Sequence, residues 1–170
     1  NSIEKEFNES IHGQFVKRGN NDAPTCTNCH GEHNILKTDD PDSPVAFKNV
    51  SIQVCSPCHE SVKLSEKYGF SANRYKTFSE SYHGLALTGG SAAVANCGSC
   101  YGIHNIKPSS DPTSMVHKDN LVKTCGSCHP GANSTFTQGT IHVTLDEQDE
   151  PILYWISTTY ILMLITVLGG

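Results

Sequence analysis

The sequence predicts a mostly irregular fold with short α-helices, followed by a C-terminal transmembrane helix. Three observations lead to this prediction. The first 150 residues contain few Leu and Ile, so a protein core alone cannot stabilise them. All eight cysteines fall in C-x-x-C pairs, and a charge-free apolar stretch lies at the C-terminal end. The 170 residues, with a net charge of -5, suit one or two small domains in which something besides side chains fills the interior.

The cysteine pairs are the strongest signal in the sequence. In chain order they read CTNCH, CSPCH, CGSCY and CGSCH, and we call them the first to fourth sites. Their cysteines are Cys26 and Cys29, Cys55 and Cys58, Cys97 and Cys100, and Cys125 and Cys128. C-x-x-C-H is the attachment motif of haem c: two thiols add to the two vinyl groups of one porphyrin, and the next residue lies under the iron, where imidazole is a good axial ligand. The sequence therefore predicts up to four covalent haem c groups with the chain wrapped around them.

Two other uses of paired cysteines fit less well. Two pairs could supply four thiolates to zinc, but the gaps of 25 and 24 residues between pairs are longer than in zinc ribbons. Zinc also gives no reason for a histidine after three of the four pairs. Disulfide bonds within C-x-x-C pairs would be strained. Haem c is the better interpretation.

The chain repeats itself with a step of 70 to 71 residues. FNESIHG recurs as FSESYHG, and CTNCHGEHNILK recurs as CGSCYGIHNIKP. Each unit carries a leading S-x-H, a first C-x-x-C site with a histidine three residues beyond it, a loop rich in Pro, Ser and Asp, and a second C-x-x-C site. We therefore expect a tetrahaem domain over 1–145 with two dihaem repeats, at about 7–70 and 78–142. A shortened third copy begins near Phe136.

The repeat gives the histidines their expected roles. The residues directly after three of the cysteine pairs, His30, His59 and His129, are the candidate proximal ligands. Five more histidines stand in repeated contexts, S-x-H or T-x-H and C-x-x-C-x-G-x-H, and are candidate distal ligands: His12, His83, His142, His33 and His104. A distal ligand often comes from another segment, so the pairing stays open at this point.

The third site departs from the other three because Tyr101 stands where they have histidine. The tyrosine could bind iron as a phenolate, as in catalase, or it could leave the iron open to a substrate. Another histidine could replace it. His117 occurs only in the repeat that lost its proximal histidine, since Ala46 stands at the matching position, and His104 is a further candidate. A sequence error at this position is the remaining alternative.

Regular secondary structure should be sparse. Segments 4–17 and 74–87 have helix-compatible spacing and carry the S-x-H motifs, and short helices should also carry the C-x-x-C sites. The stretches TDDPDSP and PSSDPTS are typical of loops. Haem packing, more than helix packing, should hold this domain together.

The last part of the chain predicts a membrane segment. An acidic linker, 146–151, comes first, and the following 17 residues, Ile152–Leu168, carry no charge. Tyr154 and Trp155 lie at its start, as expected at a membrane interface. This length reaches the lower limit for a spanning helix, so we expect a transmembrane helix over 152–170. No positive residue follows it, which favours a longer natural protein with further membrane helices.

The doubled pattern S-x-HG, C-x-x-CHG-x-H-(N/D)-I, DP-x-S and C-x-x-CH covers nearly all of 7–142. It resembles the cytochrome c3-like or doubled-CXXCH multihaem cytochromes. The tail, with its acidic linker and YWI pattern, is similar to the join between such a domain and a cytochrome b-type membrane domain. The resemblance implies bis-histidine low-spin haems in van der Waals chains, with the C-x-x-C-H histidines as proximal ligands and the S-x-H and G-x-H histidines as distal ones.

The resemblance also implies a membrane-anchored electron carrier on the periplasmic face of a bacterial inner membrane. Electrons would pass between the quinol pool and periplasmic or extracellular cytochromes, with a cytochrome b-type membrane domain or subunit as a partner. No nucleic-acid partner is expected. Two alternatives stay open: a multihaem reductase of nitrite, hydroxylamine or sulfur compounds acting at the third site, and a subunit of a cytochrome filament. No acid–base dyad, nucleophile elbow or phosphate loop stands out in the sequence.

Overall fold

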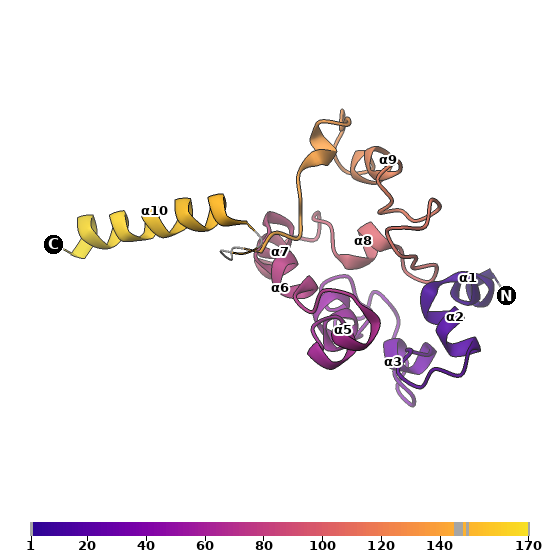
Figure 1. The fold of residues 1–170 in the computed structure, drawn as a ribbon. Coiled ribbons are helices and arrows are strands. Elements are labelled where there is room, and N and C mark those ends of the chain that lie inside the picture. The colour runs from indigo at the N-terminus through magenta and orange to yellow at the C-terminus, as the bar shows by residue number, and fades with distance from the viewer. Residues whose placement is uncertain (1, 145–147, 149, 170) are drawn as a thin grey trace. The chain divides into compact units, whose positions relative to one another are not determined.

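The computed structural model of the protein describes residues 2–144, 148 and 150–169. The chain divides into two compact units, Asn1–Gly139 and Thr140–Gly170. All four cysteine pairs lie in the first unit. Short helices joined by irregular segments make up the described part, which holds no β-strand, as the sequence predicts (Figure 1).

The helices of the first unit are mostly one or two turns long. They are α1 Ser2–Glu9, α2 Ile11–Lys17, α3 Cys26–His30, the π-helix η1 Val50–Cys55, α4 Ser56–His59, α5 Val62–Tyr68, α6 Arg74–Ser79, α7 Tyr82–Thr88, α8 Cys97–Tyr101, α9 Leu121–Gly126 and the 3-10 helix η2 Phe136–Gln138. The second unit contains α10, Pro151–Gly169. Helices therefore carry the C-x-x-C sites, as expected, although the fourth site runs from the end of α9 into a turn.

Each S-x-H motif forms a corner between two helices. Ser10 lies between α1 and α2, where its hydroxyl donates to the Phe7 carbonyl (2.6 Å) and accepts from the Gly13 N–H (3.0 Å). A serine that bonds the backbone on both sides competes with the helical ladder and favours an N-cap. Segment 4–17 is therefore two helices rather than one.

The second repeat builds the same corner. Ser81 donates to the Phe78 carbonyl (2.6 Å) and accepts from the Gly84 N–H (3.3 Å). A Cβ on Gly84 would overlap that same Phe78 carbonyl, and Gly13 stands in the matching position in the first repeat. Only glycine lets the second helix approach the first this closely. The S-x-H-G motif thus fixes each of its histidines on the first turn of the second helix.

The two Pro-rich loops are each held by one asparagine. Asn49 Nδ2 donates to the carbonyls of Pro41 (2.9 Å) and Ser43 (2.8 Å). Asn120 makes the matching two bonds in the second repeat, both at 2.8 Å. The internal repeat of the sequence is therefore also a repeat of hydrogen bonds.

The hydrophobic core of the first unit is very small. Among the described residues, the buried hydrophobic side chains are Ala46 and Phe78. The buried polar side chains outnumber them, and they are Ser10, Ser43, Ser51, Ser56, Thr77, Asn96 and Ser114. Amino-acid side chains alone build almost no apolar core here, as the composition indicates.

Helix α10 is long and apolar enough to cross a membrane. It has 19 residues, a mean hydropathy of 1.8 over 18 of them, and no part of that window is buried. The helix starts one residue before the predicted segment, and the rings of Tyr154 and Trp155 make an edge contact at 5.4 Å. Half of the predicted acidic linker, 146–151, lies outside the described residues.

Candidate functional site

The first and third sites share one local construction. In α3, Asn28 Oδ1 accepts from the Thr25 N–H (2.8 Å). In α8, Asn96 Oδ1 accepts from the Ser99 N–H (2.9 Å) and Ser99 Oγ accepts from the Asn96 N–H (3.2 Å). Residues three and four apart share a helix face. Each one-turn helix therefore presents both thiols and the residue that follows them toward the same side.

A glycine with positive φ follows each of these helices. Gly31 has a φ of 83° and Gly102 has a φ of 84°. This positive-φ, extended conformation ends the helix directly after the fifth residue of the site, and it favours glycine. The glycine in C-x-x-C-H-G is thus a requirement of the backbone.

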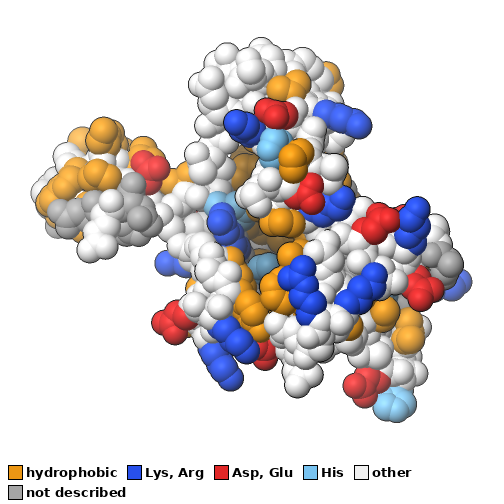
Figure 2. Space-filling view, turned by 45° about the vertical axis from the view of Figure 1, so that its right-hand side comes forward, with side chains coloured by type: hydrophobic (Ala, Val, Ile, Leu, Met, Phe, Trp, Pro, Cys, Tyr) orange, Lys and Arg blue, Asp and Glu red, His pale blue; other side chains and the backbone are white. Residues whose placement is uncertain are grey.

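Six histidines form three ring pairs in the first unit. Measured between ring centroids, the pairs are His12 and His59 at 6.2 Å, His30 and His104 at 6.3 Å, and His83 and His129 at 5.9 Å. Each pair joins one candidate proximal ligand to one candidate distal ligand. In two pairs the distal candidate comes from the S-x-H corner of the same repeat, and the third pair crosses from one repeat to the other. Figure 2 shows histidine and hydrophobic side chains lying together in a hollow of one face.

The spacing within the pairs has a chemical meaning. A bond from a histidine nitrogen to a metal is about 2 Å long and the ring centroid lies ~1 Å beyond the nitrogen, so two imidazoles on opposite sides of one iron have centroids about 6 Å apart. The distances of the three pairs match this value. The residues present at the first, second and fourth sites therefore fit one bis-histidine haem c each.

Burial keeps several of these imidazoles neutral, which is the form that binds metals. Burial, followed by the nearby His59, lowers the pKa of His12 to about 4. Burial, followed by the Arg74 guanidinium, also lowers the pKa of His59. The pKa of His83 is lowered by burial and by the adjacent His129. Aromatic rings lie against two proximal candidates, at 5.2 Å for Phe70 and His59 and at 5.0 Å for Phe136 and His129.

At the third site, Tyr101 occupies the position in α8 that His30 occupies in α3. Burial raises the pKa of the Tyr101 phenol, and the nearby positive charge of Arg74 partly opposes this shift. The two thioether candidates of the site, Cys97 and Cys100, are half-buried. The backbone of the third site thus follows the template of the first, and the difference lies in the side chain.

The three remaining histidines lie elsewhere. His33 is exposed to solvent, and His142 is half-buried in the second unit. The side chain of His117 is only 13% exposed. Its Nδ1 accepts from the Asp119 N–H (3.3 Å) and lies 3.6 Å from the Asp119 carboxylate. A metal-bound histidine usually donates a hydrogen bond from the ring nitrogen that does not bind the metal. Because Nδ1 of His117 accepts a hydrogen bond, it would have to become a donor before Nε2 could bind a metal.

All eight cysteines are free thiols in the structure. Among the described residues, no three His, Cys, Asp or Glu side chains gather around a common point.

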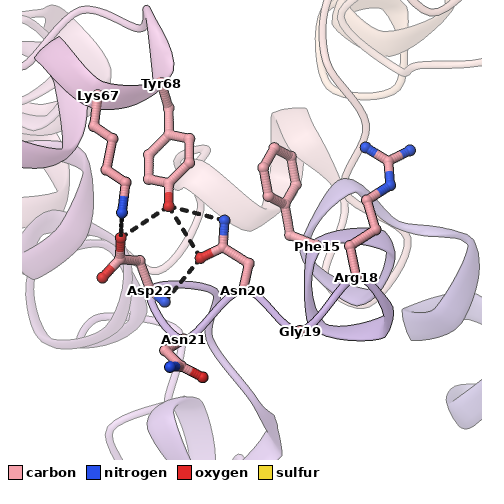
Figure 3. Close-up of a pocket in the computed structure, with 8 residues that line it drawn as sticks. All are labelled: Phe15, Arg18, Gly19, Asn20, Asn21, Asp22, Lys67 and Tyr68. Carbon is pink, nitrogen blue, oxygen red and sulfur yellow. Dashed lines mark hydrogen bonds and ion pairs between the residues drawn. The ribbon is translucent and has the colours of Figure 1, made fainter.

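A polar cluster joins the segment before the first site to the helix after the second. Tyr68 Oη donates to Asp22 Oδ2 (2.8 Å), and Lys67 Nζ makes an ion pair with the same carboxylate (2.6 Å). Asn20 Nδ2 also donates to Tyr68 Oη (2.8 Å), and Phe15 packs edge-on against the Tyr68 ring at 5.5 Å. Figure 3 shows these side chains around an open pocket of about 580 Å³. We call this group the clamp.

Sequence reasoning identified the members of the three histidine pairs and missed two other contributors. Arg74 influences both His59 and Tyr101, and neither its spacing nor its context marks it in the sequence. The glycines of S-x-H-G, Gly13 and Gly84, were visible as part of a repeated motif. Their repetition could have indicated a close helix approach. Comparison of the chain with known protein families, with curated proteins and with solved structures finds no match.

Proposed function

We propose that this chain is a membrane-anchored multihaem c-type cytochrome. It transfers electrons between the membrane quinol pool and periplasmic or extracellular redox proteins. The observation that carries the proposal is the set of three histidine pairs. Each joins a C-x-x-C-H histidine to a histidine of a repeated motif, at the spacing that two axial ligands of one iron require.

In this proposal the cysteines of the chain attach the haem and its histidines bind the iron. On attachment, each cysteine would add its S–H across one vinyl group, so that sulfur bonds to one vinyl carbon, the hydrogen goes to the other and nothing leaves. The paired histidines would hold the iron. When bound, each haem c supplies an iron that accepts or donates one electron.

Paired histidines favour electron transfer over catalysis. Both axial positions of a bis-histidine iron are occupied, so no position remains for a substrate. The neutral form of the buried histidines also avoids a competition between protons and iron for the same nitrogen. A two-electron quinol donor would release two protons and reduce two ferric irons in turn.

The near absence of a protein core supports the same proposal. A chain of this length with Ala46 and Phe78 as the buried hydrophobic side chains of its described part needs another source of apolar contacts. Porphyrin rings, held at four sites, would supply them. Hydrophobic side chains such as Ile52, Ile103 and Val122 are exposed and lie within five residues of a site cysteine.

The membrane anchor in this proposal is α10, whose length and hydropathy suit a spanning helix. Covalent haem attachment takes place on the non-cytoplasmic side of the bacterial membrane, so the first unit would lie on the periplasmic face. A cytochrome b-type membrane domain or subunit would then be the partner that receives electrons from quinol.

The test is expression of the full chain in a host with a c-type cytochrome maturation system. We expect four haems per chain by the pyridine haemochrome assay, retained in denaturing electrophoresis, with low-spin bis-histidine spectra at three sites or more. The protein should be reduced by quinol in membranes. A chain that matures without covalent haem would overturn the proposal.

The third site supports one second candidate, a multihaem reductase. The observation in its favour is Tyr101, which stands in the proximal position and lacks an imidazole. Reduction of nitrite or hydroxylamine needs an iron with an open position. A high-spin fraction of about a quarter, together with CO binding to the reduced protein, would favour this candidate; a fully low-spin protein that does not bind CO would exclude it.

A further inference from the structure

The third site and the residues that flank it have described contacts with elements of each of the other three sites. We infer that the third site is the junction of the haem network, through which the fourth site exchanges electrons with the first and second. The inference rests on the proposed function, because it concerns the order of electron transfer among the same four sites. Three independent sets of contacts carry it.

The contact with the second site is the most extensive. Cys97 N–H, at the start of α8, donates to Ser51 Oγ of η1 (3.1 Å), and Asn96 Nδ2 donates to the Phe47 carbonyl (2.9 Å). Ser51 and Asn96 are both buried, with relative exposures of 1% and 5%. Helix η1 ends at Cys55, whose thiol is hydrogen-bonded to Cys97. Attachment cysteines of the second and third sites are therefore direct neighbours.

The contact with the first site runs through a shared histidine pair. His104 follows Tyr101 by three residues, on the short loop that leaves the third site. Its ring faces His30 of the first site at 6.3 Å, with only 20° between the two ring planes. The loop is held further by the Ile11 N–H, which donates to the Ile106 carbonyl (2.8 Å). The third site thus supplies the distal candidate of the first.

The contact with the fourth site is made by Met115. Its Sδ lies 3.6 Å from the position that a Cβ on Gly102 would take, directly after the third site. Its carbonyl accepts from Thr124 Oγ1 (2.6 Å), the residue before Cys125. The third and fourth sites are therefore joined through one loop residue.

With haem bound at each site, one electron would move at each step, from a ferrous iron that becomes ferric to a ferric iron at a neighbouring site that becomes ferrous. The reductant that starts the sequence is the quinol of the proposed function, and the final oxidant is a redox protein. Haems in contact also sense each other's charge, so the potential of each depends most on the oxidation state of its nearest neighbours. If the third site is the junction, the reduction potential of its haem should depend on the oxidation state of each of the other three haems.

The experiment is an NMR-followed redox titration of the intact holoprotein, which resolves the pairwise interactions among the four haems. We expect the third haem to interact measurably with each of the other three. The interaction of the fourth haem with the third should be at least twice that with the first or the second. Equal or larger interactions of the fourth haem with the first or second would overturn the inference.

Two matched double variants provide a second measurement. Cys97→Ala/Cys100→Ala removes the third haem, and Cys125→Ala/Cys128→Ala removes the fourth. The first variant should shift the titrations of all three remaining haems, and the second should shift mainly that of the third. A third-site variant that leaves the fourth haem unshifted would contradict the junction. The haem count separates the failures: no covalent haem overturns the proposed function itself, whereas four haems with another interaction pattern overturn only this inference.

Discussion

The first and third sites have nearly the same backbone and different chemistry. Both are one-turn helices that begin at a cysteine, and both end at a glycine whose φ is 83° or 84°. The Pro-rich loops that follow them are held by matching asparagines, Asn49 and Asn120. Yet the fifth residue is His30 in one and Tyr101 in the other. The backbone of a C-x-x-C site is therefore the same whether histidine or tyrosine follows the second cysteine.

The variants with the largest expected effect remove the cysteines of one site. Cys26→Ala/Cys29→Ala and Cys97→Ala/Cys100→Ala should each lower the haem content by about a quarter, because in the proposed cytochrome each pair would hold one of four groups. The pyridine haemochrome assay on purified protein measures it. If only the first-site variant loses haem, the third site carries none, and the shared backbone does not mean shared attachment.

The next test exchanges the two fifth residues. His30→Tyr makes the first site resemble the third, and Tyr101→His makes the third resemble the first. We expect the spectrum of a haem whose site lacks the proximal histidine to double in intensity in His30→Tyr and to disappear in Tyr101→His. The reason is that each helix presents its fifth residue from the same backbone position. Electron paramagnetic resonance and CO binding to the reduced protein measure this.

A different result would locate the missing ligand. If the unaltered protein is entirely bis-histidine while His30→Tyr is not, a histidine from elsewhere serves the third site. His117→Ala would then create a high-spin signal if His117 is that ligand. The first repeat has Ala46 at the matching position, so it has no such replacement.

A smaller effect comes from Arg74, which lies close to the fifth residues of the second and third sites. Its positive charge would favour the ferrous state of an iron bound at either site. Arg74→Gln should therefore lower the potentials of these two haems by roughly 1 kcal/mol or less, or ~40 mV, because the guanidinium is exposed and screened by solvent. Spectroelectrochemical titration measures the shift.

The control for Arg74 is Lys76→Gln, which removes the same charge from the same helix, α6, at another exposed position. It should leave the second and third haems nearly unchanged. Equal shifts in both variants would show that total charge, and not the position of Arg74, sets the potentials.

Much of this organisation could be predicted from sequence because it is local or repeated. The C-x-x-C spacing, the glycine after the pair and the recurring S-x-H motif each depend on a few neighbouring residues. Among the described residues, the lack of strands and the small core also follow from composition. The partners of His12, His30 and His83 could not be predicted, because they depend on how distant segments fold back. The helix break at Ser10 was missed because apolar spacing does not report a serine that caps.

The clamp is the second difference between the repeats, and it predicts the smallest effect. Asp22 accepts from Lys67 and Tyr68, whereas Ala93 stands at the matching position in the second repeat. These hydrogen bonds lower the pKa of Asp22, so the stabilisation is present above the ordinary carboxyl pKa of 3.8 and is lost as the pH falls below that value. Asp22→Asn should lower the melting temperature by a few degrees at most at neutral pH, since the pair is solvent-exposed.

The pH dependence separates this clamp from a general charge effect. The difference in melting temperature between the unaltered protein and Asp22→Asn should shrink as the pH falls below 3.8, because protonation removes the same carboxylate that the variant lacks. Asp39→Asn, with the same charge change on an exposed loop residue, is the control and should melt like the unaltered protein. Circular dichroism follows both. If the two variants melt alike at every pH, the clamp adds nothing to the stability of the first repeat.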